Sequence, residues 1–352
     1  MCMSDNAALN INGVKIEHFK SFSVSADIYT ADCSFQMELS NPETVISAGE
    51  RCDLSINNTK ELTGLIDKPS RKWSKNETHF GIEGRSLMGL LVDTYCTQAM
   101  DLENTTIKSL ANTLLKNVPY INTKDIVYEQ DVIGRLKGKP KMGVFANADN
   151  AYAYSKIEPG MTIFDVLKQY ATSRGLMFFG LPDGTFVFGT LKSQGDPVYT
   201  LTLRKDGQNN NVMEAECSED FSKRYSDIYI LAEQQGTTNI WGNACNPHDS
   251  VTDLTFPFKK PFVGRNNYGD SMSCKKYAGM ILDKQKHDAF NATYKVPGFS
   301  QNGKNWAINQ VVHIDDEVNG LNGSYLIHGR TFELSKSGSF TTLRVGLLGG
   351  MY

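Results

Sequence analysis

The chain has 352 residues, a formal net charge of −3 and 21% charged residues, values that are ordinary for a globular protein of two or three domains. The slightly acidic balance argues against a protein that binds nucleic acid through clustered Lys and Arg. No run of about 18 apolar residues occurs, and the N-terminus has neither the basic start nor the apolar run of a signal peptide, so we expect no membrane span and no secretion.

The first ninety residues show the two-residue period of β-strands. In residues 22–28 and 33–39 every second side chain is apolar, which indicates one buried and one solvent-facing side. The short polar connection at residues 29–32 predicts that the two runs form a hairpin. Because further short β candidates follow, we expect a first β domain over residues 1–98; these candidates are residues 53–56, 62–66 and 79–83.

A helical period replaces the strand period near residue 100. Apolar residues recur at three- and four-residue steps between Ile107 and Val118, which predicts one helix, and a second is predicted from about Thr162 to Arg174. Thr162 and Asp165 fit a capping box at the start of the second helix. Pro182-Asp183-Gly184 predicts a hairpin turn between two apolar runs. With an aperiodic loop at residues 134–150, these elements predict an α/β middle domain over residues 99–200.

The β pattern returns over residues 201–352. A long helix is predicted within it, at about residues 271–288. Residues 236–269 show no clear period, which predicts a loop insertion that contains Trp241, Phe256, Phe258 and Phe262. The remaining residues supply the strands of a second β domain; the candidate strands are residues 199–203, 226–231, 290–296, 310–314, 324–327 and 341–347.

Two β segments of the chain resemble each other. Thr63–Gly84 aligns with Ser324–Val345 at a constant offset of 261 positions, which places residue 324 on residue 63. Leu65-Ile66 then falls on Leu326-Ile327, and each copy has a Ser-Lys pair at its turn. With a three-residue gap, Leu54–Ile56 can also be placed on Val312–Ile314. Such a duplication predicts a mixed β and α+β multidomain fold, in which two similar antiparallel β domains flank an α/β insert.

No recognisable catalytic or metal-binding constellation occurs in the sequence. The Gly-Lys-Ser/Thr of a phosphate loop, the HExxH of a zinc site and the GxSxG of a hydrolase are all absent. Asp315-x-Glu317-x-Asn319-Gly320 begins like a calcium loop, but Leu326 stands where the closing Glu is required. The seven cysteines include no Cys-x-x-Cys, which predicts reduced thiols. We therefore expect no enzymatic activity, no cofactor and no metal.

A known family has the motifs of the middle segment in the same order. They run from Tyr154 to Leu167, continue through Tyr170-Ala171, Arg174-Gly175-Leu176 and the turn at residues 182–184, and end at Val187-Phe188. This segment resembles the middle of Mu-type phage tail hub proteins, which belong with the late control protein D and the N-terminal half of the type VI spike protein VgrG. Further segments with this resemblance are Glu83–Leu87, Lys275–Asp288, Gly303–Trp306 and Gly323–Ile327.

The resemblance implies a structural protein of a contractile tail baseplate. It implies a homotrimer whose subunits each contribute two tail-tube-like β-barrels to a pseudo-sixfold ring. Such a ring would join the hexameric tail tube to a trimeric spike protein, with baseplate wedge proteins as further partners and DNA only as passing cargo. The protein would be made in the bacterial host cytoplasm and would act in the virion tail. The aromatic residues of the aperiodic stretch 236–269 are the predicted partner interface; they are Trp241, Phe256, Phe258 and Phe262. The alternative is that this stretch is a loop that covers the subunit's own barrel.

Other function classes remain open at this stage. A tail-associated hydrolase of cell wall or glycan would need a cleft with paired carboxylates. A host-surface glycan-binding module would use aromatic stacking platforms, for which three tryptophans are few. A type VI spike carrier would have a long β-helical C-terminal extension. Because this sequence ends at Tyr352, we expect the spike to be a separate protein.

Overall fold

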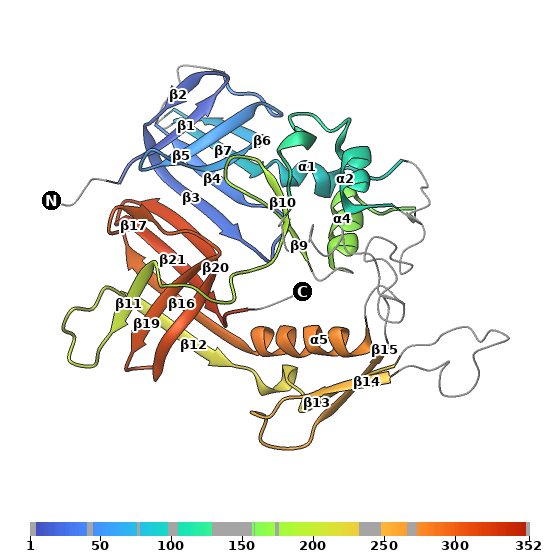
Figure 1. Ribbon diagram of the computed structural model, residues 1–352. Coiled ribbons are helices and arrows are strands. Elements are labelled where there is room, and N and C mark those ends of the chain that lie inside the picture. Colours follow the sequence, from blue (N-terminus) through green and yellow to red (C-terminus); the bar gives the residue numbers. More distant parts are fainter. Residues whose placement is uncertain are drawn as a thin grey trace.

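The computed structural model describes residues 5–40, 45–75, 78–97, 105–128, 157, 159–172, 176–231, 248–265 and 273–349. Antiparallel β-sheet is the main secondary structure of these residues, with helices in two separate places (Figure 1). Within the same ranges, no helix is both long and apolar enough to cross a membrane.

The N-terminal strands form one antiparallel set, which we call the first β unit. The predicted hairpin of residues 22–28 with 33–39 is confirmed, because Phe22 lies opposite Met37 and Val24 lies opposite Phe35. The strands are ordered β3-β4-β7-β6-β5-β1-β2. Their bounds are β1 (Ala7–Ile11), β2 (Val14–Ile16), β3 (Phe19–Asp27), β4 (Ser34–Leu39), β5 (Arg51–Ile56), β6 (Thr59–Trp73) and β7 (Thr78–Ser86).

The middle segment contains the predicted helices around a core of its own. The capping box is confirmed, since Thr162 N donates to Asp165 Oδ2 (3.2 Å) and Asp165 N donates to Thr162 Oγ1 (3.1 Å). The turn at residues 182–184 is also confirmed, with Gly184 at φ +90°. The predicted loop at 134–150 lies outside the described residues. The elements are α1 (Met88–Asp93), α2 (Ile107–Leu115), η1 (Thr123–Asp125), β8 (Val127–Tyr128), α4 (Ile163–Thr172), β9 (Met177–Gly180) and β10 (Phe186–Gly189).

The C-terminal strands form a second β unit. Their order is β12-β16-β21-β20-β19-β11, and the β11·β19 pair is parallel. A small hairpin of β17 (Ser300–Gln301) and β18 (Lys304–Asn305) precedes β19. The bounds of the main strands are β11 (Tyr199–Leu203), β12 (Glu214–Glu219), β16 (Phe290–Pro297), β19 (Gln310–Asp316), β20 (Leu321–Ser335) and β21 (Gly338–Gly346).

A small α+β insertion separates β12 from β16. It contains η3 (Phe221–Lys223), β13 (Asp227–Leu231), β14 (His248–Thr252), β15 (Pro261–Arg265) and α5 (Cys274–Ala289). The predicted long helix is therefore confirmed as α5. The prediction of a loop throughout residues 236–269 was wrong for β14 and β15, which pair with β13 on its two sides. Both strands are largely exposed, so their sequences lack the buried alternation by which strands are recognised.

The structure confirms the internal repeat. β6 and β20 each have 15 residues, β7 and β21 each have 9, and both hairpins contain a β-bulge at the same aligned position, after Ile66 and after Ile327. The strand order 3-4-7-6-5-1 of the first β unit matches 12-16-21-20-19-11 of the second. One detail of the alignment was wrong. The ladders place Cys52, rather than Leu54, on Val312, because Cys52 lies opposite Gly64 and Val312 lies opposite Tyr325.

The two β units share one sheet and one core. Strand β3 of the first unit pairs with the C-terminal half of β20 of the second, so 13 strands form a continuous sheet (Figure 1). The largest hydrophobic core contains residues of both units, among them Phe22 and Phe332, each at most 4% exposed. Burying such aromatic rings removes a large apolar area from water, which stabilises the junction.

Candidate assembly surfaces

The junction of the two β units contains a buried ion pair. Arg330 Nη2 of β20 lies 2.7 Å from Glu61 Oε2 of β6, and the two side chains are 3% and 6% exposed. Arg330 Nη1 also donates to the carbonyl of Trp306 (2.8 Å), and Asn305 Nδ2 donates to Glu61 Oε1 (2.6 Å). These hydrogen bonds offset part of the cost of burying the two charges and connect the two halves of the chain.

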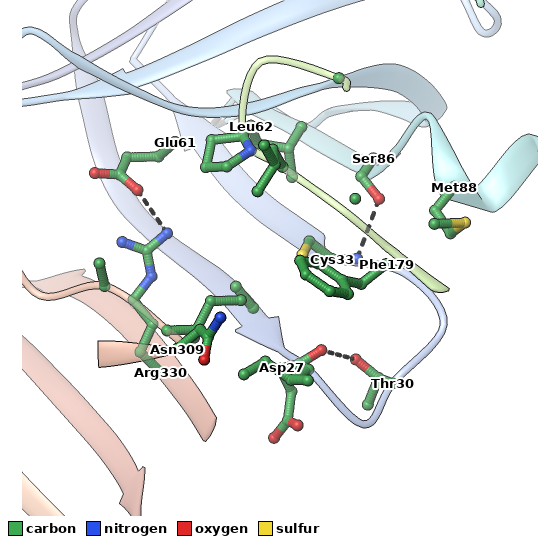
Figure 2. Close-up of a pocket in the computed structure, with 18 of the residues that line it drawn as sticks. Asp27, Thr30, Cys33, Glu61, Leu62, Ser86, Met88, Phe179, Asn309 and Arg330 are labelled. Carbon is green, nitrogen blue, oxygen red and sulfur yellow. Dashed lines mark hydrogen bonds and ion pairs between the residues drawn. The ribbon is translucent and has the colours of Figure 1, made fainter. Parts of the chain in front are cut away.

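A cavity of about 280 Å³ lies beside this ion pair, between the end of β3, β6, the start of α1 and the β9–β10 hairpin (Figure 2). Its lining is mostly apolar and includes Leu62, Met88 and Phe179. Its two carboxylates are engaged, since Glu61 is bound by Arg330 and Asp27 Oδ2 accepts from Arg344 Nε (2.8 Å). The cavity therefore offers no pair of free carboxylates for acid–base chemistry.

Other reactive groups near this cavity are held in structural roles. Burial raises the pKa of the Cys33 thiol, and the Cys33 backbone N–H donates to Ser86 Oγ (3.2 Å). A half-buried thiol with a raised pKa is a poor nucleophile. Within the described ranges, no group of three or more His, Cys, Asp and Glu side chains could hold a metal ion.

Next to the cavity, two histidines meet beside β3. Tyr29 Oη lies 2.7 Å from His287 Nε2, and the ring centroids of His287 and His328 are 5.5 Å apart. Burial, followed by the nearby His328, lowers the pKa of His287 to about 4. His287 is therefore neutral at pH 7, and this cluster connects α5 to the junction of the β units.

The predicted partner residues divide into two environments. Phe256 and Phe258 form one aromatic cluster with Phe221, with ring centroids 4.9 to 6.2 Å apart. Phe262 is half-buried in another core, beneath α5, where its ring lies 5.3 Å from that of Tyr225. Trp241 lies outside the described residues. The sequence grouped these residues because they are close in the chain, and it could not show that they belong to different clusters.

Only one of the three described aromatic residues is largely exposed. Phe256 is 8% exposed, whereas Phe258 is 59% exposed. The Arg224 guanidinium lies over the ring of Phe256 and pairs with Asp253, whose pKa it holds well below the usual range. Phe256 thus supports the insertion itself, and Phe258 is the side chain available to a partner. Its role as a partner contact stays a prediction.

Comparison with known proteins supports the resemblance seen in the sequence. Residues 6–86 match the family described as Mu phage baseplate assembly protein GpP-like, N-terminal. No protein of curated function matches the sequence significantly.

Solved structures match the chain over almost its full length. A tail protein from Neisseria meningitidis MC58 has 24% identity and a TM-score of 0.80, with 99% of each chain covered. The 43 kDa tail protein of prophage MuSo2 from Shewanella oneidensis has 19% identity and a TM-score of 0.77, covering 99% of this chain and 100% of that one. The E. coli c3393 protein, a type VI secretion component described as similar to the T4 tail proteins gp27 and gp5, has 12% identity and a TM-score of 0.58, covering 96% and 76%. The chain therefore has the fold of phage tail proteins.

Proposed function

We propose that this protein is a structural hub in the baseplate of a contractile, Mu-like phage or prophage tail, and that three copies form a pseudo-sixfold ring. The observation that carries the proposal is the duplication within the chain. Two β units with the same strand order lie edge to edge, joined by the β3·β20 ladder. Three such chains would present six similar units, which suits a ring between a sixfold tube and a threefold spike.

In this proposal the three predicted domains form different parts of the subunit. Residues 1–98 and 201–352 supply the tube-like β domains of the ring, and residues 99–200 supply the middle domain. The partners are a hexameric tail tube protein, a trimeric spike protein and baseplate wedge proteins, with DNA as passing cargo. The protein is made in the host cytoplasm and acts in the virion tail. The match of residues 6–86 to a baseplate assembly family supports this assignment.

The proposed role is non-enzymatic. The engaged state of Asp27 and Glu61 supports it, because a glycan hydrolase needs one carboxylate free to protonate the leaving group and another free to act as base or nucleophile. Zymography on cell walls and glycan-array binding test the two other function classes, and we expect no cleared zone and no selective glycan signal.

Electron microscopy of the purified chain tests the proposal most simply. Averaged images should show a ring with threefold symmetry and six similar lobes. Closed twofold particles, or isolated subunits at high concentration, would contradict it.

A further inference from the structure

The β3·β20 ladder shows how one β unit joins another. The C-terminal half of β20 pairs with β21 on one side and with β3 on the other. In this ladder Thr331 lies opposite Ser25, and their hydroxyl oxygens are 3.2 Å apart. The paired segment of β20, residues 329–334, is buried or half-buried. Because the two β units are duplicates, we ask whether the strands that correspond to β20 and β3 in the other unit have unpaired edges.

The first β unit leaves the equivalent edge open. At the offset of 261 residues, residues 329–334 of β20 correspond to residues 68–73 of β6. These residues pair with β7 on one side, and no other described strand pairs with them. Except for half-buried Pro69 they are exposed, and Trp73 is 80% exposed.

The second β unit leaves the complementary edge open. In the first unit, Phe22 of β3 lies opposite Met37, which lies opposite Ile82. In the second unit, Ala215 of β12 lies opposite Tyr294, which lies opposite Leu343. Because Ile82 and Leu343 correspond in the repeat, Phe22 corresponds to Ala215. Among the described strands, β12 pairs with β16 alone and ends the sheet. Ala215 and Cys217 pack against the shared core, and every other side chain of β12 is exposed. In Figure 1, β6 lies in the upper part of the molecule and β12 in the lower part.

We propose that β6 of one copy of this chain pairs with β12 of the next copy, in the antiparallel register of the internal β3·β20 ladder. This register places Ser70 opposite Ser218, Arg71 opposite Cys217 and Lys72 opposite Glu216. The proposal deepens the proposed ring and rests on it, because it names the surface through which the subunits associate.

Charge complementarity identifies a second copy as the occupant of these edges. The open edge of β6 contains Lys68, Arg71 and Lys72, whereas β12 contains Glu214, Glu216 and Glu219 and is followed by Asp220. Two β6 edges or two β12 edges would repel each other, and β6 with β12 attract. The contact is therefore head-to-tail, and repeated head-to-tail contacts form a ring where the rotation between successive copies closes, as the proposed ring requires.

Two pairs of the proposed ladder have counterparts in the internal one, whereas Arg71 opposite Cys217 replaces the apolar pair of Phe332 and Val24. The hydroxyl pair of Ser25 and Thr331 is replaced by Ser218 and Ser70. On the other face, Trp73 would lie opposite Ala215, where the internal ladder has Leu334 opposite Phe22. Trp73 would then lose its exposure against the partner, which accounts for a large aromatic side chain at an open edge.

Lys and Pro on an edge strand can also serve to prevent pairing. Pro69 lacks a backbone N–H, so the proposed ladder would lack one hydrogen bond at this position. An edge that only prevents pairing would bring no particular residues of two copies together. The proposed pairing with β12 instead places specific residues of β6 opposite specific residues of β12, and this difference can be tested.

A cysteine experiment measures the register. Arg71→Cys in the full chain should form a disulfide with native Cys217 of the next copy under mild oxidation, because directly opposed Cα atoms of an antiparallel ladder lie about 4.5–5.5 Å apart, which is within the range of disulfides. Lys72→Cys is the matched control, since its side chain points to the other face. We expect covalent oligomers on a non-reducing gel for R71C, none for K72C, and their loss in R71C/C217S. Equal cross-linking of R71C and K72C, or cross-links that persist without Cys217, would overturn the register.

A charge exchange provides an independent test. Lys72→Glu and Glu216→Lys should each raise the concentration needed for assembly at least tenfold by light scattering, and the double variant K72E/E216K should restore assembly. Far-UV circular dichroism equal to wild type establishes that each variant folds. If the wild-type chain forms a ring but R71C does not cross-link and K72E/E216K does not restore assembly, the β6·β12 interface is wrong and the proposed hub is unaffected. A wild-type chain that stays monomeric at every concentration would overturn both.

Discussion

Removing the negative charge of Glu61 should destabilise the junction of the two β units. Glu61→Gln retains the size of the side chain and a carbonyl that can accept from Asn305, but it leaves Arg330 without its counter-charge. The pair is almost fully buried, at 3% and 6% exposure, with 2.7 Å between Nη2 and Oε2 (Figure 2). An unpaired buried charge of this kind lowers the free energy of unfolding by about 3–5 kcal/mol.

The same strand provides a matched control. Lys68 of β6 and Glu83 of β7 form an ion pair at 3.5 Å, with side chains 67% and 48% exposed. Because water screens this pair, Glu83→Gln should change the free energy of unfolding by no more than about 1 kcal/mol. Replacing both charges of the buried pair in E61L/R330M should be less costly than E61Q alone, because neither charge is then left unpaired.

Urea unfolding and hydrogen exchange measure these effects. We expect the unfolding midpoint of E61Q to fall well below those of wild type and E83Q, and amide exchange in β3 and β20 to accelerate most. A midpoint for E61Q equal to that of E83Q would refute the reasoning that the buried pair stabilises the junction.

Three further predictions concern single positions. Gly84→Ala should lower the melting temperature, because a Cβ there would lie 2.4 Å from a backbone oxygen, whereas Gly279→Ala in α5 meets no atom within 4 Å and should stabilise by about 0.5–1 kcal/mol; thermal unfolding of both checks this. Because the pKa of His287 is lowered to about 4 in the folded protein, its contribution to the free energy of unfolding should be fully present above pH 6.5 and should be lost as the pH falls toward 4, where the unfolded state binds the proton first. The urea midpoint should depend less on pH in His287→Gln. Phe256→Ala should lower the free energy of unfolding by about 3 kcal/mol, and Phe258→Ala by less than about 1 kcal/mol. Loss of partner binding by F258A in a pull-down would therefore indicate a direct contact. Equal decreases in melting temperature for the two variants would contradict the difference in their burial.

Local patterns in the sequence predicted the elements that bury one face. The two-residue period identified the β3–β4 hairpin, and the coincidence of Leu65-Ile66 with Leu326-Ile327 identified the repeat because both pairs are largely buried strand residues. Strand β12 was missed, since Glu214, Glu216 and Glu219 conceal the alternation of its two small apolar side chains. An acidic strand with Ala215 and Cys217 at alternate positions is the signal that could have found it.

Contacts between distant segments could not be predicted from local patterns. Ser25 and Thr331 are 306 residues apart in sequence yet lie in one ladder, and Glu61 binds Arg330 from the other end of the chain. Which strands pair depends on register and on the surfaces of whole units, neither of which is encoded in the period of one strand. For this reason the sequence suggested a duplicated fold but could not locate the junction between its copies.

The mass of the chain in solution tests the central claim most directly. Light scattering on a size-exclusion column, over a range of concentrations and salt, should give about 117 kDa, three times the 39.1 kDa of one chain. Rising salt should favour smaller species, because charged edges join the subunits. A mass that corresponds to a dimer or tetramer, or a chain that stays monomeric at the highest concentration, would contradict the trimeric ring.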